Sequence, residues 1–107
     1  MDLGRLANAL QIASAVDPGG LYVHHLQILL TVREAGPAGC TYATIEERHG
    51  LSNAAASRSV NALSESARHR KTCMGLVEIR RDPVEGRRYV VVLTKKGEAL
   101  MRSIEQI

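Results

Sequence analysis

The chain contains neither phenylalanine nor tryptophan, and its aromatic residues are three tyrosines. Its interior must therefore be filled by leucine, isoleucine, valine and alanine, which form a light core. With 107 residues, such a chain is long enough to bury one core but not two. We expect a single domain over residues 1–107, with modest stability as a monomer.

The sequence also lacks long apolar runs. No stretch approaches the roughly 18 consecutive apolar residues that a membrane-spanning helix needs. The first ten residues, MDLGRLANAL, carry an acidic residue and an amphipathic pattern, whereas a secretory signal has a basic region followed by an apolar one. We expect an uncleaved cytoplasmic protein with no membrane partner.

Cysteine and histidine are too scattered to predict a metal site. Cys40 and Cys73 form no CxxC pair, and the four histidines show no ligand spacing. We expect His24 and His25 to be partly exposed helix residues. The basic residues 69–71 before Cys73 would favour a thiolate, so a redox-sensing thiol is one interpretation, but we favour an inert thiol. No cofactor is indicated. An enzyme is not expected either, because the sequence shows no nucleophile–base–acid set and no phosphate loop.

Positive charge is concentrated in the second part of the chain. Residues 1–65 hold four arginines against six acidic residues, whereas residues 66–107 hold ten lysines and arginines against five acidic residues. The net charge is therefore −2 in the first segment and +5 in the second. Such asymmetry fits an anionic partner, of which nucleic acid is the commonest, although an ordinary solvated basic face is an equal alternative.

The most informative motif is LSNAAASRSVNALSESA, residues 51–67, whose pattern is typical of a recognition helix in a helix-turn-helix. Ser52 is a suitable N-cap residue. At about 100° per residue, one narrow apolar arc must face a core, namely Ala56, Val60, Leu63 and Ala67. The opposite side gathers small or hydrogen-bonding side chains that a DNA major groove accepts, namely Ser57, Arg58, Asn61, Ser64 and Arg68.

A shorter helix precedes this one and completes the helix-turn-helix, residues 41–67. Thr41 caps the predicted helix of residues 42–49, and Ile45 is its main core residue. Gly50 supplies the left-handed residue that ends one helix and turns into the next.

Two helices are predicted ahead of this pair. Residues 2–16 have two apolar sides, Leu3, Leu6, Ala7, Leu10 and Ala13 against Ile12 and Val16. A helix of this kind usually meets two partners, so Ile12 and Val16 would face water if it packed only on its own chain. Residues 17–20, DPGG, stop this helix. Residues 21–36 predict a largely buried second helix, whose apolar stripe is Val23, Leu26, Leu29 and Leu30.

A β-hairpin and a last helix follow the helix-turn-helix. Residues 69–75 are basic and fit either a helix extension or a loop. Alternating and β-branched residues then predict two strands within residues 76–94, joined by a turn at residues 83–87. A final helix, residues 95–107, has the apolar side Leu100, Met101, Ile104 and Ile107. The fold class is therefore mainly α with a small β-hairpin (α+β), a winged helix-turn-helix with extra N- and C-terminal helices.

The residues of this region resemble the multiple antibiotic resistance regulator (MarR) family of bacterial transcription factors. The resemblance rests on TYATIEERHGLSNAAASRSVNAL and on GLVEIRRDPVEGRRYVVVLTKKGEALM, residues 41–63 and 75–101. Its most specific parts are the Ser57-Arg58 pair, the Arg87-Arg88 pair and the segment LTKKG. The family prefers a small residue in place of Glu46 and an apolar one in place of His49.

The resemblance implies a homodimer that places two recognition helices in successive major grooves of a pseudo-palindromic operator, with each wing reaching the flanking minor groove. It implies recognition-helix contacts from Ser57 and Arg58, and a wing arginine from the Arg87-Arg88 pair, of which we favour Arg87. Many family members respond to a small phenolic or otherwise apolar ligand or to a thiol. The sequence assigns no such effector here.

We therefore expect a sequence-specific, double-stranded DNA-binding transcription regulator that acts as a dimeric repressor. The alternative is a winged helix that docks on a larger protein complex. The expected DNA contacts are Ser52, Asn53, Ser57, Arg58, Asn61, Arg68, Arg70, Lys71, Arg87 and Arg88. The expected dimer contacts come from the terminal helices, Leu3, Ile12, Val16, Leu100 and Ile104, with a smaller interface than is usual in the family.

Overall fold

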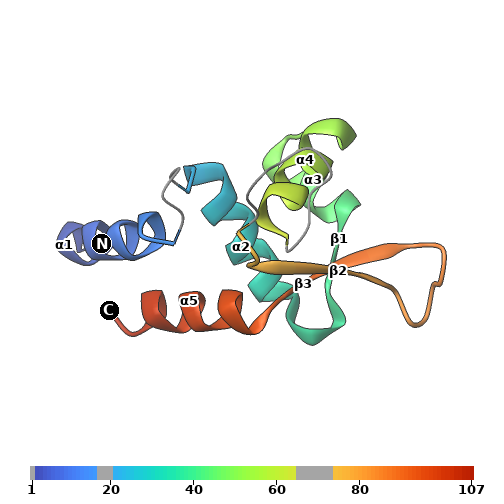
Figure 1. The fold of residues 1–107 in the computed structure, drawn as a ribbon. Helices are drawn as coiled ribbons and strands as arrows, with labels where there is room; N and C mark the ends of the chain where they lie inside the picture. Colours follow the sequence, from blue (N-terminus) through green and yellow to red (C-terminus); the bar gives the residue numbers. More distant parts are fainter. Residues whose placement is uncertain (1, 17–20, 65–73) are drawn as a thin grey trace.

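The computed structural model describes residues 2–16, 21–64 and 74–107. The helices and strands that it contains follow the order expected for a winged helix, so the predicted α+β fold class is confirmed (Figure 1). In chain order they are α1 (Leu3–Ser14), α2 (Val23–Ala35), the 3-10 turn η1 (Gly36–Ala38), β1 (Cys40–Thr41), α3 (Tyr42–His49), α4 (Asn53–Leu63), β2 (Val77–Arg81), β3 (Tyr89–Leu93) and α5 (Lys95–Glu105).

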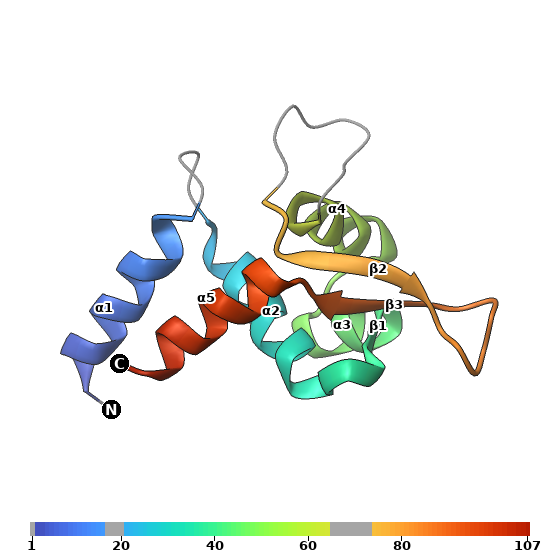
Figure 2. The ribbon, with the colours of Figure 1, turned by 60° about the horizontal axis from the view of Figure 1, so that its bottom comes forward.

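The sheet has three antiparallel strands in the order β1-β3-β2. Val91 in the central strand pairs with Ile79 of β2 on one side and with Cys40 of β1 on the other. The β2–β3 hairpin was predicted from the alternation of its residues, but β1 was not, because two residues are too short to show a period. Figure 2 shows the hairpin extending beyond the helices as a wing.

The core lies where α2, α3, α4, α5 and the sheet meet. Its largest fully buried side chains come from α2, α3, α4, the sheet and the segment leading into it, and they are Ile28, Leu29, Val32, Ile45, Val60, Leu63, Leu76, Val77 and Val91. None of them is aromatic, as the composition requires. Fully burying such a side chain stabilises the fold by roughly 1.5–3 kcal/mol.

Helix α2 buries a different face from the predicted one. His25, Ile28, Leu29 and Val32 are buried, whereas Val23 and Leu30 of the expected stripe are exposed. The buried residues are spaced i, i+3, i+4 and i+7, which is one face of a helix. The expectation that His25 is partly exposed was therefore wrong, while His24 is exposed as predicted.

Helix α1 also packs on the core with the face that was not expected to meet it. Ile12 and Val16 are half-buried and pack against the core. The leucine stripe is exposed instead, with 73% of Leu3, 40% of Leu6 and 41% of Leu10 accessible. The expectation that Ile12 and Val16 face water in a single chain was therefore wrong, because this side of α1 lies along α5 (Figure 2).

Helix α4 ends earlier than predicted. Its last residue is Leu63, and Ser64 has an extended backbone that forms a parallel bridge to Val77 of β2. The amide of Gly75 donates to the Ser64 carbonyl at 3.0 Å, which ties the end of the helix to the start of the wing. The predicted helix of residues 51–67 is thus too long, and Ser64 is buried and not on the outward face.

Helix α5 is tied to the segment before β2 by a short motif. The Thr94 hydroxyl accepts from the amide of Gly97 at 3.1 Å and donates to the carbonyl of Gly75 at 2.6 Å. A Cβ atom at Gly97 would lie 2.1 Å from the carbonyl oxygen of Leu76, so a side chain does not fit there. Lys96 donates to the carbonyl of Met74 at 2.9 Å. The LTKKG segment therefore fixes how α5 leaves the sheet.

Some predicted features lie outside the described residues, among them the stop at residues 17–20 and most of the basic segment 69–75. Within the described residues, no helix is long and apolar enough to cross a membrane.

Candidate nucleic-acid interface

Helix α3 begins and ends, and helix α4 begins, at the capping residues that the sequence predicted. The Thr41 hydroxyl accepts from the amide of Thr44 at 3.2 Å and begins α3. Gly50 ends this helix with a left-handed backbone, φ 61° and ψ 37°, which glycine adopts without strain. The Ser52 hydroxyl then accepts from the amide of Ala55 at 3.1 Å and begins α4. Because Ser52 is engaged as a cap, its hydroxyl is oriented by the helix itself.

Helix α3 is fixed against α2 by a polar contact at the position where the family prefers an apolar residue. The Thr31 hydroxyl donates to the carbonyl of Gln27 at 3.2 Å, and it lies 2.9 Å from Nε2 of His49. His49 therefore binds α2 through a hydrogen bond instead of apolar packing.

The predicted two faces of α4 are present. Ala56, Val60 and Leu63 have essentially no exposed surface and pack into the core. The remaining sides carry the predicted polar residues, of which Asn53 and Arg58 are exposed and Ser57 and Asn61 are half-buried. Because the core fixes one side of the helix, the other side is held at a defined angle to the rest of the molecule.

Arg58 is the cation on the outward side of α4. A salt bridge to Glu46 or to Glu65 is the alternative to a DNA contact for this side chain. Glu46 instead accepts a long hydrogen bond from the Asn53 amide, at 3.5 Å, and no described residue forms an ion pair with Arg58. Glu65 lies outside the described residues, as do Arg68, Arg70 and Lys71. The Arg58 guanidinium thus faces solvent without a described carboxylate partner.

The wing turn is organised by one carboxylate, Asp82. Its Oδ1 accepts from the amides of Val84 at 2.9 Å and Glu85 at 3.3 Å, while Oδ2 accepts from Nε of Arg88 at 3.0 Å. The hydrogen bonds from Arg88, and then from the Val84 amide, lower the pKa of Asp82 below its usual value. Arg88 is thereby bound within the turn, whereas Arg87 is exposed and has no described ion-pair partner.

Sequence reasoning missed a second arginine contact in the wing. The Arg81 guanidinium lies over the ring of Tyr89, 5.6 Å from its centroid, and donates to the carbonyl of Gly86 at 3.3 Å. Arg81 of β2 pairs with Tyr89 of β3. The alternation of residues predicts both strands, but it does not predict which residue of one strand lies opposite which residue of the other. This contact lies at the last strand pair before the wing turn.

The residues expected to form a dimer are divided between surface and core. Leu3 is exposed, whereas Leu100 is buried and Ile12, Val16 and Ile104 are half-buried against the core of their own chain. Four of the five are thus at least partly covered without a partner.

Neither a metal site nor an activated thiol is formed by the described residues. No group of three or more histidine, cysteine, aspartate or glutamate side chains among them is placed to hold a metal ion. Cys40 of β1 is buried, and desolvation raises the pKa of its thiol despite the opposing charge of Arg48. A raised pKa makes this thiol a poor nucleophile.

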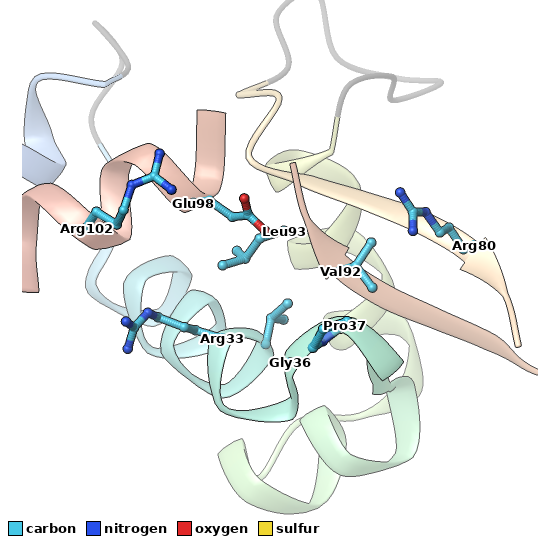
Figure 3. A pocket seen from close by; sticks show the side chains of 9 residues that line it. Arg33, Gly36, Pro37, Arg80, Val92, Leu93, Glu98 and Arg102 are labelled. Carbon is cyan, nitrogen blue, oxygen red and sulfur yellow. The ribbon is translucent and has the colours of Figure 1, made fainter. Parts of the chain in front are cut away.

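One hollow of the described part lies away from α4. It measures about 660 Å³ and is bounded by α2, η1, the sheet and α5. Figure 3 shows Arg33, Arg80 and Arg102 around it, with Val92 and Leu93 between them. Arg33 is paired with Glu105 and Arg80 with Glu78, at 2.6 and 3.0 Å. Two of its three cations are therefore already neutralised by the chain.

Comparisons with known proteins identify the fold. No protein-family model and no curated protein match the sequence, but solved structures match this chain over nearly its whole length. A mutant of MepR from S. aureus bound to an oligodeoxyribonucleotide has a TM-score of 0.73 and 16% identity, over 97% of this chain and 67% of that one. A mutant of MarR from E. coli complexed with operator DNA has a TM-score of 0.66 and 22% identity, over 97% and 71%.

A third match carries a different ligand. CouR from Rhodococcus jostii bound to p-coumaroyl-CoA has a TM-score of 0.67 and 23% identity, over 97% of this chain and 68% of that one. The matched proteins are MarR-family transcription regulators. At these identities the likeness shows the fold, so the chain has the winged-helix fold that MarR-family regulators share.

Proposed function

We propose that this protein is a sequence-specific, double-stranded DNA-binding transcription regulator of the MarR type. The observation that carries this proposal is the outward side of α4, where Arg58, which has no ion-pair partner among the described residues, stands beside Asn61 on a helix whose other face is buried. Arginine pairs bidentately with guanine and asparagine with adenine in the major groove. The DNA-bound structures of MepR and MarR support the same use of this fold.

The wing is proposed to make the second contact. Arg88 is held by Asp82, so its task is to shape the turn, while Arg87 is free to enter a minor groove. Narrow, A·T-rich minor grooves attract arginine because their negative potential is enhanced. Lysines and arginines that contact phosphates, among them the undescribed Arg68, Arg70 and Lys71, would supply most of the affinity.

We further propose a dimeric repressor that acts in the cytoplasm and has no catalytic activity. The exposed leucines of α1 support a dimer, because covering such side chains stabilises an assembly by roughly 1.5–3 kcal/mol for each full burial. A two-fold dimer would match a pseudo-palindromic operator. A repressor of this kind excludes other proteins from the DNA that it occupies.

Selection of bound duplexes from a random pool tests the proposal. We expect a short site with two-fold symmetry. Arg58→Ala should weaken binding to the selected duplex by about 1–3 kcal/mol and relax the preference at one position in each half-site. Arg102→Ala removes the same charge from α5 and serves as the control. Recovery of no duplex would instead favour a winged helix that docks on other proteins.

A further inference from the structure

A groove runs between the start of α2 and one side of α4. It measures about 540 Å³ and lies on the face of the molecule that carries Arg58. Tyr22, His24 and His25 line it from α2, and Leu51, Ala55 and Arg58 line it from the α4 side. This groove was not expected from the sequence, since its two walls are separated by about a third of the chain.

The α2 wall of the groove is a cluster of three rings that carry hydrogen-bond donors, and one pair of them is stacked. The ring centroids of Tyr22 and His24 are 5.6 Å apart with an interplanar angle of 15°, and those of His24 and His25 are 4.2 Å apart. Tyr22 is 60% exposed and His24 is exposed, whereas His25 is buried beneath them. The phenol O–H of Tyr22 and an imidazole N–H of His24 are donors that a bound anion can use.

The charge of the groove favours an anion. Among the described residues that line it, Arg58 is the one arginine or lysine, and none is a carboxylate. This distinguishes it from the larger hollow beside α5, where Glu105 and Glu78 neutralise two of the arginines. Because Arg58 also belongs to the outward side of α4, the groove continues the proposed DNA-binding surface without a break.

We propose that the groove between α2 and α4 receives the sugar–phosphate backbone of the bound DNA, with Tyr22 and His24 contacting phosphate oxygens next to Arg58. This inference rests on the proposed function and extends its contact surface to α2. A DNA strand suits the groove because a duplex on the outward side of α4 brings its backbone alongside the helix, where the groove opens. Contacts of this kind fix the register of the protein on the duplex and carry no sequence information.

The test adds a charge at the proposed contact and measures its effect on DNA binding. His24→Lys places a permanent cation against the phosphates. It should tighten binding to selected and mixed-sequence duplexes alike, and it should steepen the slope of log affinity against log salt by about 0.9. Gln27→Lys adds the same charge one turn further along α2, at an exposed residue outside the groove lining. It should leave the slope unchanged.

A second variant removes one donor and keeps the ring. Tyr22→Phe should weaken binding to both duplexes by the same factor, roughly 2- to 10-fold, since a single hydrogen bond is lost. The side chains of Tyr22 and His24 are both exposed, so each variant should keep the fold, and thermal melts check this. The inference is overturned if the wild-type protein binds DNA but two results are found together: His24→Lys has the same salt slope as Gln27→Lys, and Tyr22→Phe has the same affinity as the wild type. If the wild-type protein does not bind duplex DNA, the proposed function itself has failed.

Discussion

The winged-helix part of the molecule and helix α1 bury apolar side chains to very different extents. Residues from α2 to α5 enclose a core of fully buried leucine, isoleucine and valine side chains, whereas α1 contributes one buried residue, Ala13. Its leucines face away from the chain. The winged helix therefore contains most of the apolar burial that stabilises it, while α1 retains apolar surface that the described residues leave uncovered.

The largest expected difference between these two parts is in stability. Leu63→Ala removes a fully buried side chain beneath α4 and should lower the free energy of unfolding by about 2–5 kcal/mol. Leu6→Ala on α1 removes a side chain that is already 40% exposed, so its cost to the isolated chain should be much smaller. Urea denaturation at low protein concentration measures both. Equal losses would show that α1 is as integral to the fold as α4 is.

The next expected effect concerns the joint between the wing and α5. Gly97→Ala places a methyl group against the backbone carbonyl of Leu76 and should destabilise the chain by about 1–3 kcal/mol, because backbone cannot move aside cheaply. Gly86→Ala is the matched control, since a Cβ atom there meets no atom within 4 Å. Differential scanning calorimetry compares the two. A Gly97→Ala protein that melts with the wild type would contradict the close approach.

The apolar surface of α1 can be tested through assembly. Leu6→Glu should convert a dimer into a monomer, since a buried unpaired carboxylate opposes association, and should change folding little. Asn8→Glu puts the same charge on the other side of α1. Ile12 and Ile104 are unsuitable for this test because they pack against the core of their own chain. Light scattering coupled to size exclusion gives the mass, and a wild-type monomer at micromolar concentration would remove the dimer from the proposal.

The smallest expected effect concerns the wing turn and depends on pH. Because the folded-state pKa of Asp82 is lowered below 3.8, its contacts stabilise the fold above that value and are lost as the pH falls through the folded-state pKa. Asp82→Asn should therefore be less stable than the wild type at neutral pH, and the difference should vanish in strong acid. Glu85→Gln, on the same turn, is the control. A difference in melting temperature between Asp82→Asn and the wild type that stays the same at every pH would refute this account of the turn.

The start and end of α3 and the start of α4 could be predicted because their signals are local. Thr41, Gly50 and Ser52 act on amides and carbonyls within a few residues of themselves. The end of α4 could not, because it depends on a bridge from Ser64 to Val77, across the undescribed residues 65–73. The orientation of α1 and of α2 was also wrong, since each helix has apolar residues on more than one side and only tertiary packing selects between them.

Three of the five residues predicted for the outward side of α4 lie on that helix, whereas Ser64 is buried past its end and Arg68 lies outside the described residues. The groove beside α4 was not predicted. Helical periodicity places Ser57, Arg58 and Asn61 on one surface, and the fixed core side confirms that placement. The groove requires the start of α2 to lie next to α4, which no local pattern reports. The pairing of Arg88 with Asp82 could not be predicted either, because its hydrogen bonds depend on the shape of the wing turn.

The central claim is that the outward side of α4 binds double-stranded DNA through contacts that include phosphates. Fluorescence anisotropy with the selected duplex at salt concentrations from about 50 to 200 mM tests it directly. We predict a steep, linear fall of log affinity with log salt, weaker binding by Arg58→Ala at every salt concentration, and unchanged binding by Arg102→Ala. Absent binding, or an affinity that does not respond to salt or to Arg58→Ala, would contradict the claim.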